Sequence, residues 1–295
     1  MALISSKCGK DDPKGEYVYE YPRPAMTADN VIFGFGGNKL QILLVERGIE
    51  PFKGSWALPG GFLRMSETIE ECARRELREE TNVHDVYLEQ FHVFSDPRRD
   101  PRGRVVTVAF IALVRPSDHA VIGGDDASNA MWFDVDMLPP LAFDHLQIID
   151  KARVYLKEML RIKPLAFNLL NEVFSVDELR NVYEVITGNT YDRRNFYRKL
   201  MQSNLLKDAD EDSMVASESR CSESMHSDAN NADVLSPQEH IISSYCKSDL
   251  VPLSLKNEDA PKKSKRKLRF FRFNEERDLN NDSDEDASIK DLFSF

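Results

Sequence analysis

The sequence contains no long apolar run and few cysteines, and both absences exclude classes of protein. No apolar stretch approaches the roughly 18 residues of a membrane span. The N-terminus, MALISSKCGKDD, also lacks the apolar segment of a secretory signal. The four cysteines are far apart and form no C-x-x-C pair, so neither a zinc site nor a disulfide framework is indicated. We therefore expect a soluble protein of the cytoplasm with no membrane partner.

The acidic excess, a formal net charge of −11, is concentrated in two segments. Residues 208–260 contain 12 acidic and 3 basic residues, and residues 274–295 contain 8 acidic and 2 basic residues. The other residues together are therefore mildly basic. Both acidic segments lack hydrophobic periodicity, which predicts a disordered insertion over 208–260 and a disordered tail over 275–295. Residues 1–15 are polar and are also expected to be disordered.

The first half of the chain alternates strand and helix signals. The runs VIFGF and LQILLVER flank a Gly-Gly-Asn turn and predict a hairpin. A helix is expected over 68–81, because Thr68 and Glu71 can form a capping box and Asn82 suits the left-handed position that follows. PFKGSWALPGGF reads as a loop, VVTVAFIALV as a strand and 145–162 as a helix that ends before Pro164. A possible short strand at Glu16–Tyr21 precedes them, and we expect one domain over 16–163.

The helix over 68–81 carries a dense group of carboxylates. Glu76, Glu79 and Glu80 have i, i+3 and i+4 spacing, so they share one helix face. Carboxylates this close repel one another unless a cation lies among them, and hard oxygen ligands suit Mg²⁺ or Mn²⁺. Arg75 can orient Glu79, and Glu67 can brace Arg75. The alternative is a solvated acidic helix face.

The spacing of these residues resembles the Nudix pattern. That pattern is Gly, five residues, Glu, seven residues, then Arg-Glu-hydrophobe-any-Glu-Glu-any-Gly-hydrophobe. The chain supplies Gly61, Glu67, Arg75, Glu76, Leu77, Glu79, Glu80 and Val83. It departs from the pattern at Asn82, which replaces a Gly and tolerates positive φ better than most residues.

The resemblance implies an α/β fold, a Nudix α/β/α sandwich with a mixed sheet. It also implies metal-dependent cleavage of a small molecule linked to a nucleoside diphosphate. By resemblance, the catalytic residues are Arg75, Glu79 and Glu80, and the ligands of Mg²⁺ or Mn²⁺ are Glu76, Glu79, Glu80 and the carbonyl of Gly60. A Nudix domain that binds its ligand without hydrolysing it is the alternative.

The segment SDPRRDPRGRVVTVAF resembles the ADP-ribose pyrophosphatase branch of the family. Guanidinium groups suit anionic oxygens, so the candidate substrate-binding residues are Arg98, Arg99, Arg102 and Arg104. In the alternative interpretation these arginines pair with Asp96 and Asp100 on a surface loop. Asp125 and Asp126, in a later loop, could supply a base or simply be solvated.

Residues 164–207 form a second helical unit. LAFNLLNEVF is expected to be a short apolar helix, Ser175 and Glu178 can cap a helix that Gly188 ends, and DRRNFYRKLMQ predicts a further helix. This segment resembles the winged-helix domain of the Nudix-related transcriptional regulators. The last helix would bury Phe196 and Leu200 and could lie in a major groove. The candidate DNA-binding residues are Arg193, Arg194, Asn195, Arg198 and Lys199.

The wing of this domain is predicted to be interrupted. SNLLK at 203–207 resembles the start of a first wing strand, but the next alternating run is KLRFFRF at 267–273. We therefore assign 164–207 plus 261–274 to the winged helix. The basic run KKSKRK fits the wing, a nuclear-localisation-like run or a solvated linker, and we favour the wing.

Together these features predict a regulator that binds operator DNA as a homodimer and recognises and hydrolyses ADP-ribose or a related nucleotide sugar. The alternative function is a plain Nudix hydrolase whose C-terminal domain serves only dimerisation.

Overall fold

The computed structural model describes residues 23–119, 127–209 and 269–274. Its larger sheet has the order β3-β2-β1-β6-β5, with β4 also paired to β1 and β7 to β2. β1 and β6 are parallel, and every other pair is antiparallel, so the sheet is mixed. The strands are β1 (Ala25–Gly36), β2 (Lys39–Arg47), β3 (Trp56–Ala57), β4 (Gly60–Phe62), β5 (Glu89–Phe94), β6 (Val105–Val114) and β7 (Ala127–Asp134).

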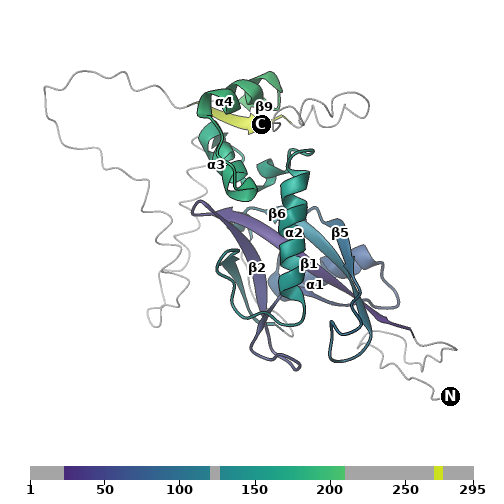
Figure 1. Ribbon diagram of the computed structural model, residues 1–295. Helices are drawn as coiled ribbons and strands as arrows, with labels where there is room; N and C mark the ends of the chain where they lie inside the picture. The colour runs from purple at the N-terminus through teal and green to yellow at the C-terminus, as the bar shows by residue number, and fades with distance from the viewer. Residues whose placement is uncertain (1–22, 120–126, 210–268, 275–295) are drawn as a thin grey trace, which may run out of the picture.

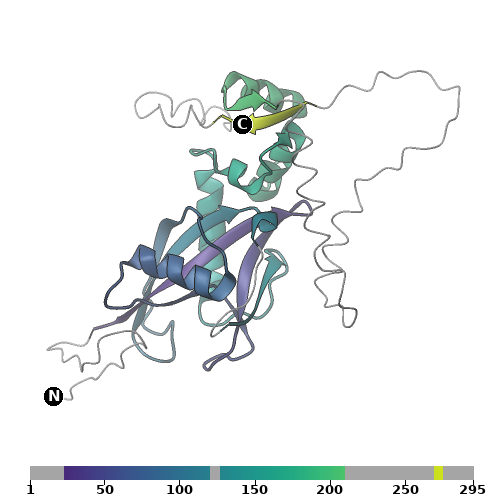
Figure 2. The same ribbon diagram turned by 180° about the vertical axis from the view of Figure 1, so that it is seen from behind.

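One helix covers each face of this sheet, as the two opposite views show (Figures 1 and 2). α1 (Ile69–Thr81) packs Leu77 against Ile32 and Leu43, whereas α2 (His145–Met159) packs Ile148 and its neighbours against Val31 and Phe33. Alternate residues of β1 thus point to opposite faces, as the period of a strand requires. The predicted α/β/α sandwich is confirmed.

Local sequence signals fix the ends of several elements. Thr68 and Glu71 form the expected capping box of α1, and Asn82 adopts the left-handed conformation at φ 61°. Gly37 and Asn38 have positive φ angles and close the β1–β2 hairpin, as a tight hairpin turn requires.

Three strands of the larger sheet are absent from the prediction. PFKGSWALPGGF contains β3 and β4, which are so short that only pairing with β2 and β1 defines them. The third, β5, has a register shift between Gln90 and His92 that breaks its alternation of apolar and polar residues.

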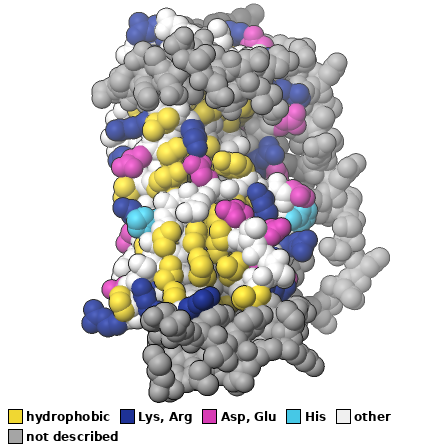
Figure 3. Space-filling view, turned by 90° about the vertical axis from the view of Figure 1, so that its right-hand side faces the viewer, with side chains coloured by type: hydrophobic (Ala, Val, Ile, Leu, Met, Phe, Trp, Pro, Cys, Tyr) yellow, Lys and Arg dark blue, Asp and Glu magenta, His cyan; other side chains and the backbone are white. Residues whose placement is uncertain are grey.

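Side-chain contacts connect the outer strand β5 to α2. Phe91 lies 5.6 Å from the ring of Tyr155, whose hydroxyl donates to Glu89, and Lys163 also donates to Glu89. Val93 is exposed, and hydrophobic side chains gather along this side of the molecule (Figure 3).

The second unit follows α2. Its elements are a 3-10 helix, η2 (Leu165–Leu169), a short strand β8 (Phe174–Ser175), α3 (Val176–Thr187), α4 (Arg193–Gln202), β9 (Leu206–Asp208) and β10 (Phe270–Phe273). The expected single helix over LAFNLLNEVF is wrong, because only its first half is helical and Phe174 pairs in a sheet. The capping box of Ser175 and the left-handed Gly188 are as expected.

β10 pairs antiparallel with both β9 and β8, so strands far apart in sequence form one small sheet. Phe271 is 1% exposed at its centre. The predicted pairing of the two wing segments is confirmed, and Asp208 belongs to β9. Predictions for residues 1–22, for Asp125 and Asp126, for 210–268 and for 275–295 lie outside the described residues. Within the described ranges, no helix is long and apolar enough to cross a membrane.

Candidate functional site

Arg75 stands at the centre of the carboxylate group on α1. Its guanidinium donates to both carboxylate oxygens of Glu67, at 2.8 and 2.7 Å, and also to Glu76 at 2.7 Å and Glu79 at 3.1 Å. The hydrogen bonds from Arg75 lower the pKa of Glu67 to about 2. Glu67 is therefore a fixed anion that orients Arg75, as the sequence suggested.

Gly61 lets the β-sheet backbone approach α1 closely. A Cβ atom at this position would lie 2.2 Å from a carboxylate oxygen of Glu76, so the Glu76 side chain would have to move away. The glycine of the Nudix pattern thus makes room for a carboxylate. Burial raises the pKa of Glu76, so its charge depends on nearby cations.

Glu80 is turned toward the preceding glycine. The backbone N–H of Gly60 donates to the Glu80 carboxylate at 2.8 Å. Burial raises the pKa of Glu80 to about 8, and repulsion from Glu76 and Asp29 adds to the effect. A buried carboxylate with other carboxylates nearby is stabilised as an anion by a cation.

The donor chemistry of this region fits a divalent cation with a preference for oxygen. Within the described ranges, no three His, Cys, Asp or Glu side chains already surround one metal position. Arg75 accounts for this, because it holds Glu76 and Glu79 at its own guanidinium. The residues that could hold Mg²⁺ or Mn²⁺ are Glu76, Glu79, Glu80 and the carbonyl of Gly60.

A buried ionic network lies beside the carboxylates. Arg99 donates to Asp144 at 2.8 and 3.0 Å and to Asp29 at 3.2 Å, and its side chain is 4% exposed. Asp29 also lies 4.0 Å from the ring of His145. Sequence reasoning did not single out Asp29, Asp144 or His145. The available signal for Asp29 was a carboxylate two residues before the apolar run VIFGF.

The four candidate substrate-binding arginines do not converge. Arg98 is 93% exposed beside Asp96, Arg99 is buried, and Arg104 donates to the carbonyl of Ser95. Arg102 forms an ion pair with Asp100 at 2.6 Å, as the alternative interpretation expected, and lies over the ring of Phe62. Arg102 and Arg99 both lie near the Gly60–Phe62 strand, because Arg102 lies over Phe62 and Arg99 binds Asp29, which pairs with Gly60. The substrate role of all four arginines stays a prediction.

Four of the five candidate DNA-binding residues are exposed on α4. Phe196 and Leu200 are buried, whereas Arg193, Arg194, Asn195 and Arg198 are exposed and Lys199 is half-buried. Asp192 caps the helix by accepting from the N–H of Asn195. Arg193 also forms an ion pair with Asp177 on α3. α4 therefore presents a basic face to solvent.

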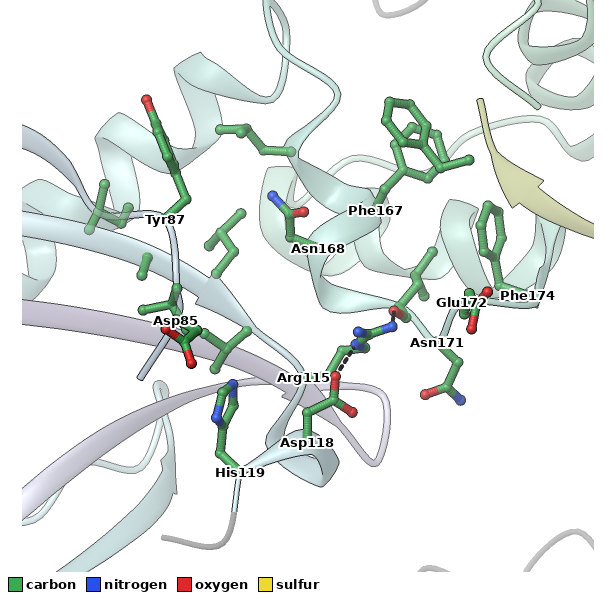
Figure 4. Close-up of a pocket in the computed structure, with 18 of the residues that line it drawn as sticks. Asp85, Tyr87, Arg115, Asp118, His119, Phe167, Asn168, Asn171, Glu172 and Phe174 are labelled. Atoms are coloured by element: carbon green, nitrogen blue, oxygen red, sulfur yellow. Dashed lines mark hydrogen bonds and ion pairs between the residues drawn. The ribbon is translucent and has the colours of Figure 1, made fainter. Parts of the chain in front are cut away.

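A separate cleft of about 920 Å³ lies between the two units (Figure 4). Tyr87 lines it from the segment before β5, and Arg115 and His119 line it from the segment after β6. On the other side it is lined by residues of the segment that leads into the second unit, namely Phe167, Asn171 and Glu172. Arg115 binds Asp118 at 2.6 Å and donates to the carbonyl of Leu170. None of the residues predicted to bind metal, substrate or DNA lines this cleft.

Comparison with known proteins identifies both units. Residues 23–152 match the NUDIX domain family, and residues 166–222 match the NrtR DNA-binding winged helix domain. The chain is 35% identical over 195 residues to the ADPR responsive transcriptional repressor NtrR of Acinetobacter baylyi, which covers 65% of this chain and 78% of that protein. It is 43% identical over 129 residues to the ADP-ribose pyrophosphatase of Methanocaldococcus jannaschii, covering 44% and 73% of the two chains.

A solved structure supports the same arrangement. NrtR of Shewanella oneidensis, in its crystal structure complexed with a 27mer DNA, has a TM-score of 0.57 and 36% identity over 62% of this chain and 85% of that chain. A Nudix domain fused to a winged-helix DNA-binding domain therefore defines the class of this protein. Within that class, the chain belongs to the NrtR family of Nudix-related transcriptional regulators.

Proposed function

We propose that this protein is a DNA-binding transcriptional regulator that responds to ADP-ribose and also hydrolyses it. The observation that carries the proposal is the presence, in one chain, of the complete Nudix carboxylate set around Arg75 and of the exposed basic face of α4. The relatives support both halves, since one is named as an ADPR responsive repressor and another as an ADP-ribose pyrophosphatase.

Each residue of the Nudix helix has a role in the proposed reaction. Mg²⁺ or Mn²⁺, when bound, would polarise the diphosphate and lower the pKa of the attacking water. Glu76, Glu79, Glu80 and the Gly60 carbonyl would hold it. Arg75 pairs with Glu76 and Glu79 in this structure and would orient them beside the cation, and Glu67 holds Arg75 in place. Water adds to one phosphorus, the P–O–P bridge breaks, and AMP and ribose 5-phosphate leave.

The DNA-binding half rests on α4. Its exposed arginines can contact phosphates, and Asn195 near its N-terminus can reach a base edge. A homodimer on a palindromic operator stays part of the proposal, because winged and helix-turn-helix modules commonly read two half-sites. A shift assay with the upstream region of the protein's own operon tests this half, and no shift would favour the plain hydrolase.

Glu80→Gln tests the hydrolytic half. The variant removes a metal ligand but keeps the size and an acceptor for the Gly60 N–H, so the fold should persist. With Mg²⁺ or Mn²⁺ we expect wild type to cleave ADP-ribose and Glu80→Gln to be slower by at least about a hundredfold. Product analysis by chromatography, with phosphate release from AMP by added phosphatase, measures the rate.

Glu70→Gln is the matched control, because Glu70 is an exposed acid on the same helix. It should cleave ADP-ribose like wild type. If wild type and Glu80→Gln are equally inactive while both bind ADP-ribose, the domain is a sensor and the hydrolytic half is wrong.

A further inference from the structure

The guanidinium of Arg102 lies between two phenylalanine rings. Its central carbon is 4.8 Å from the ring centre of Phe62 and 5.1 Å from that of Phe143, over both rings. We call the space between these rings the Phe62–Phe143 slot. Its walls come from distant parts of the chain, one at the end of β4 and the other just before α2.

Both phenylalanines that form the slot are in energetically unfavourable states. Phe62 is 42% exposed, although its ring is large and apolar. Phe143 has a φ of 51°, in the left-handed region that bulky side chains rarely adopt. Such strain persists only where the surroundings impose it, and it concentrates at functional sites.

The slot borders the Nudix carboxylates. The carbonyl of Phe62 accepts from Arg75 at 3.2 Å, which joins one wall to the centre of the carboxylate group. Phe143 precedes Asp144, the partner of Arg99, and Arg47 lies over the Phe143 ring at 4.8 Å. A ligand with its diphosphate at the carboxylates and their cation could therefore place an adjoining group in the slot.

The occupant of the slot in this structure indicates the shape that fits. A guanidinium is flat, and it stacks on aromatic faces. Arg102 reaches this position while Asp100, itself buried, binds its Nε and Nη2 at 3.0 and 2.6 Å. A nucleobase is also flat, and aromatic side chains stack with bases of any sequence.

We propose that Phe62 and Phe143 bind the nucleobase of the nucleotide ligand and that the Arg102 guanidinium fills the slot when no base is present. This inference rests on the proposed function, and it names the group that gives the Nudix site its preference for a nucleotide. The base displaces the guanidinium, and Asp100 retains its ion pair with the moved side chain. A purine, with the larger face, binds better than a pyrimidine.

Three ligands and one substitution test the slot. Binding of ADP, UDP and pyrophosphate to the full-length protein with Mg²⁺ is measured by calorimetry, with ADP-ribose as the reference ligand. In wild type we expect the order ADP, UDP, pyrophosphate, from tightest to weakest. Phe62→Leu should weaken ADP by about tenfold or more, because base stacking on one aromatic side chain is of that size. Pyrophosphate should change less than about twofold.

A spectroscopic readout reports stacking directly. The fluorescence of 1,N6-ethenoadenosine diphosphate should be quenched on binding to wild type and not on binding to Phe62→Leu. Tyr87→Leu is the control, because Tyr87 is an aromatic residue that is 67% exposed in the cleft between the units. It should retain both the ADP affinity and the quenching of wild type.

Arg102→Lys tests the displacement. Lysine keeps a cation for Asp100 but has no flat group for the slot, so ADP should bind a few-fold more tightly than to wild type. Weaker binding of ADP would overturn the displacement and leave Arg102 as a direct ligand contact.

The outcomes of these experiments distinguish failure of the slot proposal from failure of the proposed function. If wild type binds ADP-ribose but binds ADP no more tightly than pyrophosphate, or if Phe62→Leu weakens ADP and pyrophosphate equally, the slot is wrong and the proposed function stands. If wild type binds no ADP-ribose, both are wrong.

Discussion

Arg99 and Arg102 lie in one loop, but their side chains have different surroundings in the structure. The sequence places both beside prolines and aspartates and predicts the same substrate-binding role for both. In the structure, Arg99 is enclosed by Asp29 and Asp144, whereas Arg102 is partly exposed. Removal of one partner from a buried ion pair leaves a buried charge without compensation, which costs roughly 3–5 kcal/mol. Arg99 therefore has a structural task that Arg102 lacks.

His145 adds a buried titratable group to the same network. Its Nδ1 accepts from the N–H of Leu58 at 2.9 Å, which requires the tautomer with its proton on Nε2, toward Asp29. Burial lowers the pKa of His145, although Asp29 and Asp144 act in the opposite direction. The folded protein therefore holds this ring neutral.

We predict that this histidine makes stability fall in mild acid. Above pH 6.5, its ordinary pKa, the ring is neutral in both states. Below that pH the unfolded chain gains a proton that the folded chain does not, so the free energy of unfolding should fall by up to about 1.4 kcal/mol per pH unit. Urea unfolding at pH 7.5 and pH 5.5 measures the loss.

His145→Asn provides the comparison for that measurement. Its amide oxygen can still accept from Leu58, but the side chain does not titrate. The variant should show a smaller difference between the two pH values than wild type. An equal difference would assign the acid sensitivity to other groups.

At the scale of a single element, α4 carries the DNA prediction. Two exposed arginines near its N-terminus, Arg193 and Arg194, should each contact a phosphate. The double variant Arg193→Ala, Arg194→Ala should weaken binding to all sequences alike and reduce the slope of log K against log salt by about 2. Fluorescence anisotropy across a salt series measures both quantities.

Lys151→Ala, Lys157→Ala is the matched control, because it removes the same charge from α2. It should leave the salt slope near that of wild type. A slope unchanged in the α4 double variant would show that another element contacts the DNA backbone.

The β9–β10 pair gives a second prediction for an element. β10 supplies Phe271 to the core of the second unit, and Phe273 stacks on Phe167 with ring centres 4.4 Å apart. Truncation after residue 209 should therefore destabilise the winged helix by roughly 3–5 kcal/mol, the usual cost of removing a buried Phe, and weaken DNA binding. Thermal unfolding and anisotropy measure the two effects.

Replacement of residues 212–260 by a short Gly-Ser turn, which keeps the basic run KKSKRK, is the contrasting variant. Loop closure changes by only about 0.6 kcal/mol per doubling of length, so the protein should fold. It should bind DNA as tightly as wild type or more tightly at low salt, because the acidic stretch repels phosphates. If truncation after 209 leaves DNA affinity unchanged, β10 is no part of the DNA-binding unit.

At the scale of the whole molecule, the two units pack together along one part of their junction, and a cleft separates them along another part. One hydrophobic cluster runs from Phe33 and Ile148 to Phe167 and Phe196. Asn181 of α3 donates to Asn38 at the tip of the β1–β2 hairpin, at 2.9 Å. The cleft in Figure 4 lies elsewhere along this junction. β1 therefore connects Asp29, beside the Nudix carboxylates, to a helix that packs on α4.

This connection predicts a coupling between ligand and DNA. ADP-ribose should change the affinity for operator, and operator should change the affinity for ADP-ribose by the same factor, roughly fivefold or more. Asn181→Ala should bring that factor closer to one while each affinity measured alone changes little. Anisotropy titrations in metal-free buffer, or with Glu80→Gln, avoid hydrolysis of the effector.

Gln147→Ala, which removes an exposed amide from α2, serves as its control and should keep the wild-type factor. Equal operator affinity with and without saturating ADP-ribose in wild type would exclude ADP-ribose as the effector.

The sequence by itself determined the features that depend on spacing along the chain. The Nudix helix, its capping box, the left-handed Asn82 and the common face of Glu76, Glu79 and Glu80 all follow from residues within two turns of one another. The same holds for α4, whose buried Phe196 and Leu200 leave its arginines on the opposite side. Even the interrupted wing could be predicted, because strand alternation resumed at KLRFFRF.

Only the tertiary structure decided which distant residues meet. Asp29, Arg99 and Asp144 form one buried network although they are separated by 70 and 45 positions, and Phe62 meets Phe143 across Arg102. Local patterns carry no information on such pairs, because packing of the sheet against α2 sets them. β3, β4 and β8 likewise exist only through pairing. Burial also determines the electrostatics of the site. A glutamate side chain in water has an ordinary pKa, whereas burial raises the pKa of Glu80.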